Sequence, residues 1–345
     1  MGYISAMLSQ NEKDNLVRWD PASPLGHVES YFLKANHPSE PRAFWIKFTL
    51  FCRPGEPAQA VGNVWGIVFN AKTHEHVALR QQFPLSGAVL GRERVEVRMG
   101  DSEFHTGHTK GALAMGDLSL RWDLHFDTAG EPFHHFPNEK LYKMRFPKSK
   151  AVSPYPDCPF DGTIWANGEV LEVKHWPGMQ GHNWGEKHTD RYAWGHCNEF
   201  DGNPKDTFFE GFSGRIRVGG LLLPPVTRVF LRHEGKVYPL LSAKSTFWPP
   251  ATIQHDAWEF EAEGGGYKLR GKMKADKQDM VGLYYKNPTG PNTDCLNSKL
   301  AMCHLELFKT GAKRHERVVE LHSPHGAALE VAVHEGERHG VRMYV

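Results

Sequence analysis

The chain has 345 residues and a formal net charge of +1. Hydrophobic residues make up 40% of it and charged residues 23%, which are ordinary values for a soluble globular protein. Because the charge is balanced and no basic stripe is interleaved with aromatic residues, a nucleic-acid partner is not expected. The length exceeds what one hydrophobic core usually supports, so the sequence predicts two domains.

Export and membrane insertion are not expected either. Residues 1–25 resemble a lead-in without the apolar core of a secretory signal. No segment approaches the ~20 uninterrupted apolar residues of a membrane span. The five cysteines form no C-x-x-C pair, a pattern typical of reduced thiols inside a cell. These features together predict a cytoplasmic protein.

Short strands dominate the first half of the chain. The segment Ala43–Cys52 is partly apolar on both faces, as expected where a barrel wall packs inside and against a neighbour. Asn63–Asn70 is rich in β-forming residues and is predicted to pair with it. Asn167 and Gly168 form a strong hairpin signal. The other predicted strands are His27–Ala35, Val95–Met99, Phe104–His108, Ala112–Met115, Leu118–Phe126, Phe160–Trp165 and Glu169–His175.

The second half repeats this pattern, and only Lys299–Leu307 and the first dozen residues have any helical character. The predicted fold class is all-β: two antiparallel, barrel-like units packed together, with little helix. The units are residues 26–176 and 177–345, with a hinge near Pro177. The strands predicted here are Thr207–Val218, Val226–His233, Lys236–Ala243, Ala257–Ala262, Tyr267–Lys274, Leu283–Lys286, Met302–Lys309, Glu316–Leu321 and Ala328–Val333.

The stretch Trp176–Phe200 concentrates imidazoles, carboxylates, an amide and indoles. From Tyr192 onward every second residue lies on one face of a predicted strand. That face carries large rings with two neutral polar groups, as a pocket for a mostly apolar small molecule requires. The alternative is a core strand whose polar side chains bond to backbone. The candidate ligand-binding residues on this face are Tyr192, Trp194, His196 and Asn198.

A polar cluster precedes this strand. General acid–base chemistry needs a carboxylic acid or imidazole whose pKa is tuned by a dry pocket and by neighbours. The alternative is a polar loop at the domain junction whose side chains make turn bonds. The candidate catalytic residues here are His182, Glu186 and Asp190, and Asn183 and Trp184 are further candidates for ligand binding.

Other kinds of chemistry have weaker signals. The chain has 21 histidines, but groupings such as His105 with His108 and His134 with His135 match no recognised metal-ligand spacing. No G-x-S-x-G nucleophile elbow and no phosphate-binding loop occurs. The sequence therefore predicts neither a metal nor a cofactor.

Two motifs resemble a known superfamily. Gly-His-Asn-Trp-Gly at 181–185 and Tyr-Ala-Trp-Gly-His at 192–196 are similar to the shared core of carotenoid hydratase, tocopherol cyclase and AttH-type proteins. The resemblance implies two lipocalin-like barrels with an apolar ligand at or between them. Hydratases of this group protonate an isoprenoid double bond, and their motif combines His-x-Trp with a downstream Tyr-x-Asp. His182 and Trp184 match the first half, whereas residues 207–213 lack the second, and Glu210 is the nearest substitute acid.

The resulting hypothesis is an intracellular protein that binds a hydrophobic, isoprenoid- or polyketide-like molecule and catalyses cofactor-free hydration or cyclisation of an alkene. A protonated Glu210, Glu186 or Asp190 would donate to the alkene, and His182 would orient water or the acid. The rings of Trp184, Tyr192 and Trp194 would shield a cation. The alternatives are a non-catalytic carrier or sensor, and a pericyclase that transfers no proton.

Overall fold

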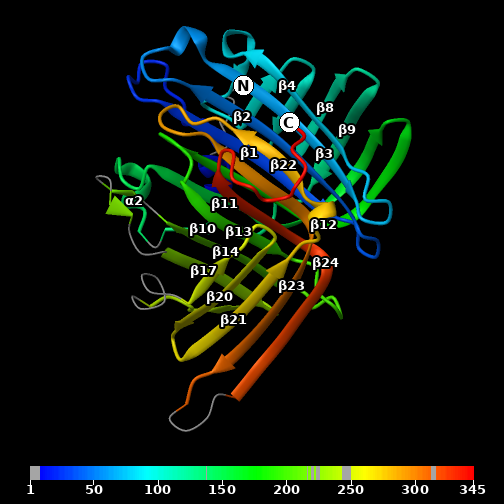
Figure 1. Cartoon of the computed structure of the whole chain (residues 1–345), viewed down its shortest axis with the longest axis vertical. Helices are drawn as coiled ribbons and strands as arrows, with labels where there is room; N and C mark the ends of the chain where they lie inside the picture. The colour runs from blue at the N-terminus through cyan, green and yellow to red at the C-terminus, as the bar shows by residue number, and fades with distance from the viewer. Residues whose placement is uncertain are drawn as a thin grey trace, which may run out of the picture.

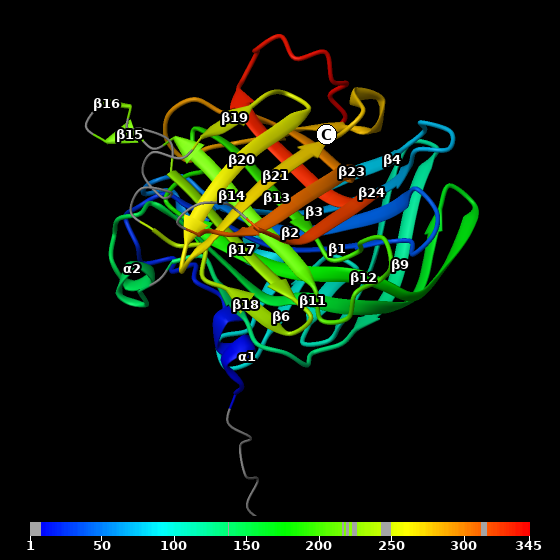
Figure 2. The same ribbon diagram turned by 90° about the horizontal axis from the view of Figure 1, so that it is seen from below.

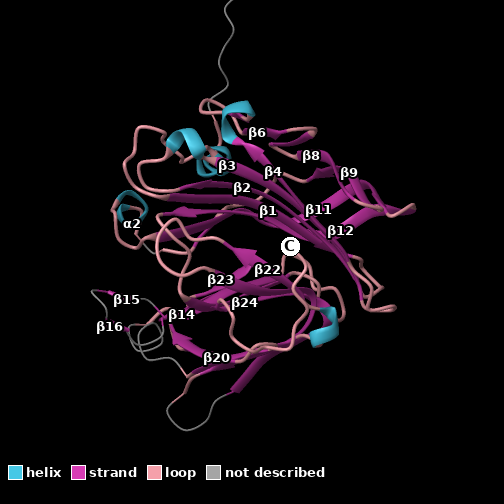
Figure 3. Ribbon diagram, turned by 45° about the horizontal axis from the view of Figure 1, so that its top comes forward, coloured by secondary structure: helices cyan, strands magenta, loops and turns pink. Residues whose placement is uncertain are grey.

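The computed structural model describes residues 8–136, 138–215, 217–218, 221–222, 226–242, 250–311 and 316–345. Two large, curled antiparallel sheets pack against each other, and in Figure 1 the first lies above the second. Helix is confined to short peripheral segments (Figure 3), so the all-β prediction is confirmed. None of the helices in these ranges is long and apolar enough to span a bilayer. The helical segments are α1 (Gln10–Asn15), α2 (Lys140–Lys143) and the 3-10 turns Pro57–Gln59, Leu85–Gly87 and Lys277–Asp279.

The first sheet has twelve strands in the order β4-β3-β2-β1-β12-β11-β9-β8-β7-β6-β5, with β10 paired to β11. Its strands are β1 (His27–Asn36), β2 (Arg42–Cys52), β3 (Val61–Asn70), β4 (Val77–Pro84), β5 (Val89–Leu90), β6 (Glu96–Met99), β7 (Ser102–His105), β8 (His108–Met115), β9 (Leu118–Phe126), β10 (Phe133–His134), β11 (Ser149–Ala166) and β12 (Glu169–Gly185).

The second sheet has ten strands in the order β18-β17-β14-β13-β24-β23-β21-β20-β19, with β22 paired to β23. The two-residue strands β15 (Arg217–Val218) and β16 (Leu221–Leu222) pair separately. The strands of the second sheet are β13 (Arg191–Cys197), β14 (Phe208–Arg215), β17 (Val226–His233), β18 (Lys236–Tyr238), β19 (Ala251–Ile253), β20 (Ala257–Gly264), β21 (Tyr267–Lys274), β22 (Val281–Tyr285), β23 (Thr293–Lys309) and β24 (Glu316–His334).

Strand β2 explains how the sheets meet. Its residues Phe44, Ile46 and Phe48 point into the core of the first sheet. On the opposite face Trp45 packs in a separate cluster with residues of β3 and with Leu283 of β22. The expectation that both faces of this segment are buried, one inside and one against a neighbour, is therefore confirmed.

The hairpin predicted at Asn167 and Gly168 is present, but its strands extend much further than the sequence indicates. Strand β12 continues unbroken through Pro177 to Gly185, and its residues 178–185 pair with β1. The chain passes from the first sheet to the second at residues 186–190. The division into units of 26–176 and 177–345 stays a prediction.

Three secondary-structure predictions need correction. Lys299–Leu307, which has weak helical character, lies within strand β23, where pairing with β21 and β24 overrides local propensity. Phe104–His108 is interrupted by a tight turn that includes Gly107 and joins β7 to β8. Glu316–Leu321 and Ala328–Val333 are parts of one strand, β24. Some predicted positions lie outside the described residues. They are Ile216, within the predicted strand Thr207–Val218, Ala243, at the end of the predicted strand Lys236–Ala243, and residues 1–7 of the lead-in.

A glycine at a bulge in β11 offers a test of this hairpin. Gly162 has φ +141°, and a Cβ there would lie 2.1 Å from the carbonyl oxygen of Asp123 in β9. We expect Gly162→Ala to lower the free energy of unfolding by about 2 kcal/mol or more, measured by urea denaturation. Gly168→Ala is the matched control, because at φ +85° it adds backbone strain but meets no atom within 4 Å. An equal decrease in the free energy of unfolding in the two variants would contradict the close approach of β9 to Gly162.

Candidate active site between the two sheets

A cavity of about 90 Å³ lies between the sheets, where β1, β11 and β12 face β13 and β14. Aromatic rings form much of its wall, and a few polar groups stand among them, the combination typical of a small-molecule site. The rings are those of Phe32, Trp45, Trp184, Tyr192, Trp194, Phe212 and Tyr285. The polar groups include His135, Ser153, Asn183, His188 and Glu210.

The local chain geometry explains why β13 and β14 supply this wall. Trp194 pairs with Phe212 and His196 with Glu210 across the two antiparallel strands, and directly opposed residues project to the same side of a sheet. The alternate residues Ala193 and Cys197 point the other way, into the core of the second sheet. The even-numbered face of both strands is therefore turned toward the first sheet.

Glu210 is the best-positioned acid of the cavity. Its side chain is fully buried, and its Oε1 atom accepts hydrogen bonds from Trp194 Nε1 at 3.1 Å, Ser153 Oγ at 2.8 Å and His135 Nε2 at 3.0 Å. Its Oε2 atom is buried and has no hydrogen-bond partner among the described residues. A buried polar atom without a partner is costly, which is why such atoms concentrate where a ligand supplies the partner.

Five of the predicted site residues meet at this cavity. Asn183, Trp184, Tyr192, Trp194 and Glu210 all line it, although they come from three strands. In Asn183, the side-chain oxygen accepts a short hydrogen bond from Ser30 Oγ. Their roles in ligand binding and catalysis stay predictions.

His196 and Asn198 lie deeper in the contact between the sheets. His196 Nε2 bonds to the carbonyl oxygen of Pro156 at 2.7 Å, and burial, aided by the nearby Lys34, holds the pKa of His196 well below its ordinary value. Asn198 donates to Asp157 Oδ1 and to the carbonyl oxygen of Gly178, both at 2.8 Å. These bonds hold the end of β13 against the first sheet. They match the alternative prediction for this stretch, a core strand whose polar side chains bond to backbone.

His182 points into the core of the first sheet. Its Nε2 atom donates to Glu29 Oε1 at 2.9 Å and its Nδ1 atom to the carbonyl oxygen of Asp14 at 2.7 Å. Its ring stacks on Tyr31 with centroids 4.3 Å apart. Both nitrogens are thus engaged in fixing the N-terminal lead-in, and the structure does not bring His182 to the cavity wall with Glu210.

Glu186 and Asp190 lie on the connection between the sheets and are both ion-paired. Glu186 contacts Arg145 at 2.8 Å and Lys148 at 3.1 Å. Partial burial works to raise the pKa of Glu186, but hydrogen bonds from these two cations outweigh it and lower the pKa. Asp190 contacts Lys187 at 2.7 Å. A carboxylate that cations hold ionised, as Glu186 is held, is a poor proton donor.

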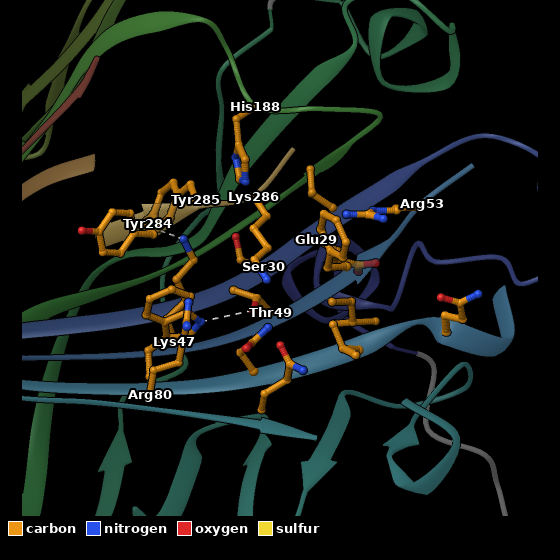
Figure 4. A pocket seen from close by; sticks show the side chains of 18 of the residues that line it. Glu29, Ser30, Lys47, Thr49, Arg53, Arg80, His188, Tyr284, Tyr285 and Lys286 are labelled. Atoms are coloured by element: carbon orange, nitrogen blue, oxygen red, sulfur yellow. Dashed lines mark hydrogen bonds between the residues drawn. The ribbon is translucent and has the colours of Figure 1, made fainter. Parts of the chain in front are cut away.

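A second chamber, of about 210 Å³, adjoins the cavity and opens to solvent. The two chambers share Val28, Lys47, His188 and Tyr285 in their walls. Figure 4 shows the second chamber between β1–β3 and the segment that carries Tyr284, Tyr285 and Lys286. Burial, together with Lys47, lowers the pKa of His188 to about 3, so its ring is neutral. We call the cavity at Glu210 the inner chamber and this one the outer chamber.

Several residues of both chambers have no recognisable signal in the sequence. His135 and Ser153 lie on either side of α2, in a stretch whose prolines indicate irregular structure, and no spacing links them to Glu210. Lys47 alternates with apolar residues in β2 and resembles an exposed residue of an amphipathic strand, yet it is 4% exposed. Only the pairing of the two sheets reveals these neighbours.

One group of possible metal ligands is present at the surface. Ligand atoms of His108, Asp123 and His125 lie within 4.8 Å of one another, because β8 and β9 pair His108 with His125. His108 Nε2 is 2.8 Å from Asp123 Oδ1, and the two imidazole rings stack with centroids 4.4 Å apart. The group lies in the first sheet, apart from both chambers, so it adds nothing to their chemistry.

Two curled antiparallel sheets with a ring-lined chamber between them define a lipocalin-like architecture. A family model described as tocopherol cyclase-like matches residues 158–333, about half of the chain, and the chain belongs to this family. The matched region contains β13, β14 and Glu210. The predicted relationship to hydratases, cyclases and AttH-type proteins is confirmed.

Individual relatives are distant. Two uncharacterised proteins from strains of Mycobacterium tuberculosis are 26% identical over 212 residues, which is 61% of this chain and 60% of theirs. A putative AttH from Nitrosomonas europaea has a TM-score of 0.50 at 14% identity, over 89% of this chain and 92% of the other. Kievitone hydratase from Nectria haematococca has a TM-score of 0.50 at 10% identity, over 96% and 94%. The structural similarity shows the shared fold.

Proposed function

We propose that the protein binds the unsaturated end of a hydrophobic small molecule in the inner chamber and catalyses cofactor-free hydration or cyclisation of an alkene. The family and the hydratase fold support this class of reaction. A chamber of about 90 Å³ is smaller than a cavity of roughly 150 Å³ that holds benzene, so it suits a terminal double bond rather than a whole isoprenoid.

The observation that carries the proposal is the two-sided environment of Glu210. In the protonated form, Oε1 acts as the carbonyl oxygen and accepts from Trp194, Ser153 and His135, while the hydroxyl at Oε2 is left for the ligand. When the proton leaves, the same three donors stabilise the negative charge that develops on the carboxylate. The site is thus arranged for the charge of the transition state.

The reaction balances without another reagent. The Oε2–H proton of Glu210 passes to one alkene carbon, whose π electrons form the new C–H bond and leave a carbocation at the other carbon. The ring faces of Trp194, Tyr192 and Phe212 shield this cation. Water or a hydroxyl group of the ligand then forms the C–O bond and returns a proton to Glu210.

Solvent isotope incorporation tests this reaction against its alternatives. The ligand that copurifies with the protein from its host is first identified by native mass spectrometry and then incubated with the protein in D₂O. Acid-assisted addition places one deuterium on carbon, because the proton of Glu210 exchanges with solvent. A pericyclic product would contain no deuterium on carbon, and a ligand returned unchanged would show a carrier or sensor. Either of these two results would overturn the proposed reaction.

A further inference from the structure

The outer chamber differs from the inner one in its charge. Four cationic side chains line it, namely Lys47, Arg53, Arg80 and Lys286 (Figure 4). Lys47 is buried in β2 and Arg80 is partly buried in β4, whereas Arg53 and Lys286 are exposed to solvent. Cations therefore stand both at the entrance and at the junction with the inner chamber.

None of these four cations forms an ion pair with a carboxylate of the described residues. Lys47 Nζ donates to Tyr285 Oη at 2.9 Å and lies 4.1 Å from the centroid of that ring. Arg80 stacks over Trp65 at 4.9 Å. Glu330, in the wall of the inner chamber, is the acid whose charge acts most on Lys47, but it forms its ion pair with Lys299 at 2.8 Å. Buried or half-buried cations without an ion-pair partner are uncommon in proteins, since burial disfavours their charge.

The two carboxylates in the wall do not neutralise them. Glu29 is fully occupied by hydrogen bonds from the lead-in, Tyr31, His27 and His182 on the far side of β1. Glu56 precedes the 3-10 turn Pro57–Gln59 and forms no ion pair with a cation of the described residues. The chamber keeps an excess of positive charge beside neutral donors such as Thr49 and Asn63.

Because the chambers adjoin at Lys47, His188 and Tyr285, a ligand that places its double bond beside Glu210 extends naturally into the outer chamber. Only together do the two approach the roughly 300 Å³ at which small-molecule pockets begin. We infer that the ligand is an amphiphilic anion, whose apolar unsaturated end enters the inner chamber and whose carboxylate or phosphate is bound in the outer chamber by Lys47, Arg80 and Lys286. This inference rests on the proposed function and names its substrate class.

Three probes with the same hydrocarbon chain test the inference: geraniol, geranate and geranyl phosphate, titrated calorimetrically into the full chain. A charge-assisted contact predicts that the wild-type protein binds at least one of the two anions about tenfold to hundredfold more tightly than the alcohol. Comparison of geranate with geranyl phosphate distinguishes a carboxylate from a phosphate. The preference is expected to shrink at high ionic strength, since Arg53 and Lys286 are exposed.

Substitutions assign the preference to the outer chamber. Lys47→Met and Lys286→Gln are expected to lose about tenfold in anion affinity and to keep the affinity for geraniol. The side chain of Lys286 is exposed and forms no hydrogen bond or ion pair with the described residues, so this variant remains informative if Lys47→Met is unstable. Lys309→Gln, at the distant end of β23, is the matched control for loss of one positive charge and should behave as the wild type.

The pH dependence gives a second readout. Burial is the main cause that lowers the pKa of Lys47 to about 8; the charge of Lys299 adds to this effect, whereas Glu330 and Cys295 act in the opposite direction. The preference for the anion should therefore weaken as the pH rises above this value, and Lys47→Met should remove that change. Geraniol binding without any preference for an anion would overturn the inference and leave the proposed function intact. Failure of all three probes to bind would overturn both.

Discussion

Replacing Glu210 with glutamine is expected to lower turnover by about 10²–10⁴-fold while the ligand still binds. Glutamine has nearly the same shape, and its amide oxygen can accept the hydrogen bonds that Oε1 receives from Trp194, Ser153 and His135. Its amide cannot deliver a proton to carbon. Turnover of the copurified ligand by mass spectrometry and its affinity by calorimetry measure the two effects separately.

The fold of Glu210→Gln serves as the internal control. Because the three donors keep an acceptor, its free energy of unfolding should stay within about 1–3 kcal/mol of the wild type. Full turnover in Glu210→Gln, together with loss of turnover in Glu186→Gln or Asp190→Asn, would mean that the proton donor lies on the connection between the sheets. Loss of affinity alone, with no reaction in the wild type, would favour a carrier.

Much of the fold follows from alternation in the sequence. The two apolar faces of Ala43–Cys52 indicated a strand buried on both sides, which is what the clusters around Phe44 and Trp45 show. The extent of β12 did not follow. Its glycines suggest a loop, yet Gly178 and Gly181 leave room for the rings of Phe160 and Phe32, which a Cβ would approach within 2.6 Å and 2.3 Å. Such close packing is invisible without the partner strands.

The site was predictable to a similar degree. Alternation along β13 places Tyr192 and Trp194 on one face, and the cavity wall contains both. His182 and Trp184 are likewise two residues apart, but the side of β12 that His182 occupies depends on pairing with β1 and on the lead-in. A histidine near a tryptophan, such as His182 near Trp184, can serve in catalysis or in a buried hydrogen-bond network. The bond from His182 to the buried carboxylate of Glu29 places it in a buried network.

Glu29→Gln is expected to lower the free energy of unfolding by about 3–5 kcal/mol, as is typical when one partner of a buried charged network is removed. The carboxylate is 1% exposed and accepts from Arg18 N at 2.8 Å, Trp19 N at 2.9 Å, His27 Nε2 at 2.8 Å, Tyr31 Oη at 2.7 Å and His182 Nε2 at 2.9 Å. The amide group of glutamine would place N–H donors opposite some of these five donors, which would then lose their acceptor. Urea denaturation measures the loss.

The lead-in should respond before the sheets do. Since Glu29 holds the amides of Arg18 and Trp19, hydrogen exchange there should accelerate in Glu29→Gln and, more weakly, in Tyr31→Phe, which removes one hydrogen bond. Glu261→Gln is a matched control. The carboxylate of Glu261 is 29% exposed and forms ion pairs with Lys268 and Arg270 at the surface. Glu261→Gln should therefore lower the free energy of unfolding by less than about 1 kcal/mol.

The pH dependence separates the charge of Glu29 from its shape. Burial works to raise the pKa of Glu29, but hydrogen bonds from His182 and His27 outweigh it and hold the pKa far below the ordinary value of 4.5. A carboxyl group whose pKa is lower in the folded state contributes its full stability above pH 4.5 and progressively less below it. The wild type should therefore lose stability more steeply than Glu29→Gln as the pH falls below 4.5. Parallel profiles in the two proteins would mean that the carboxylate is not ionised in the network.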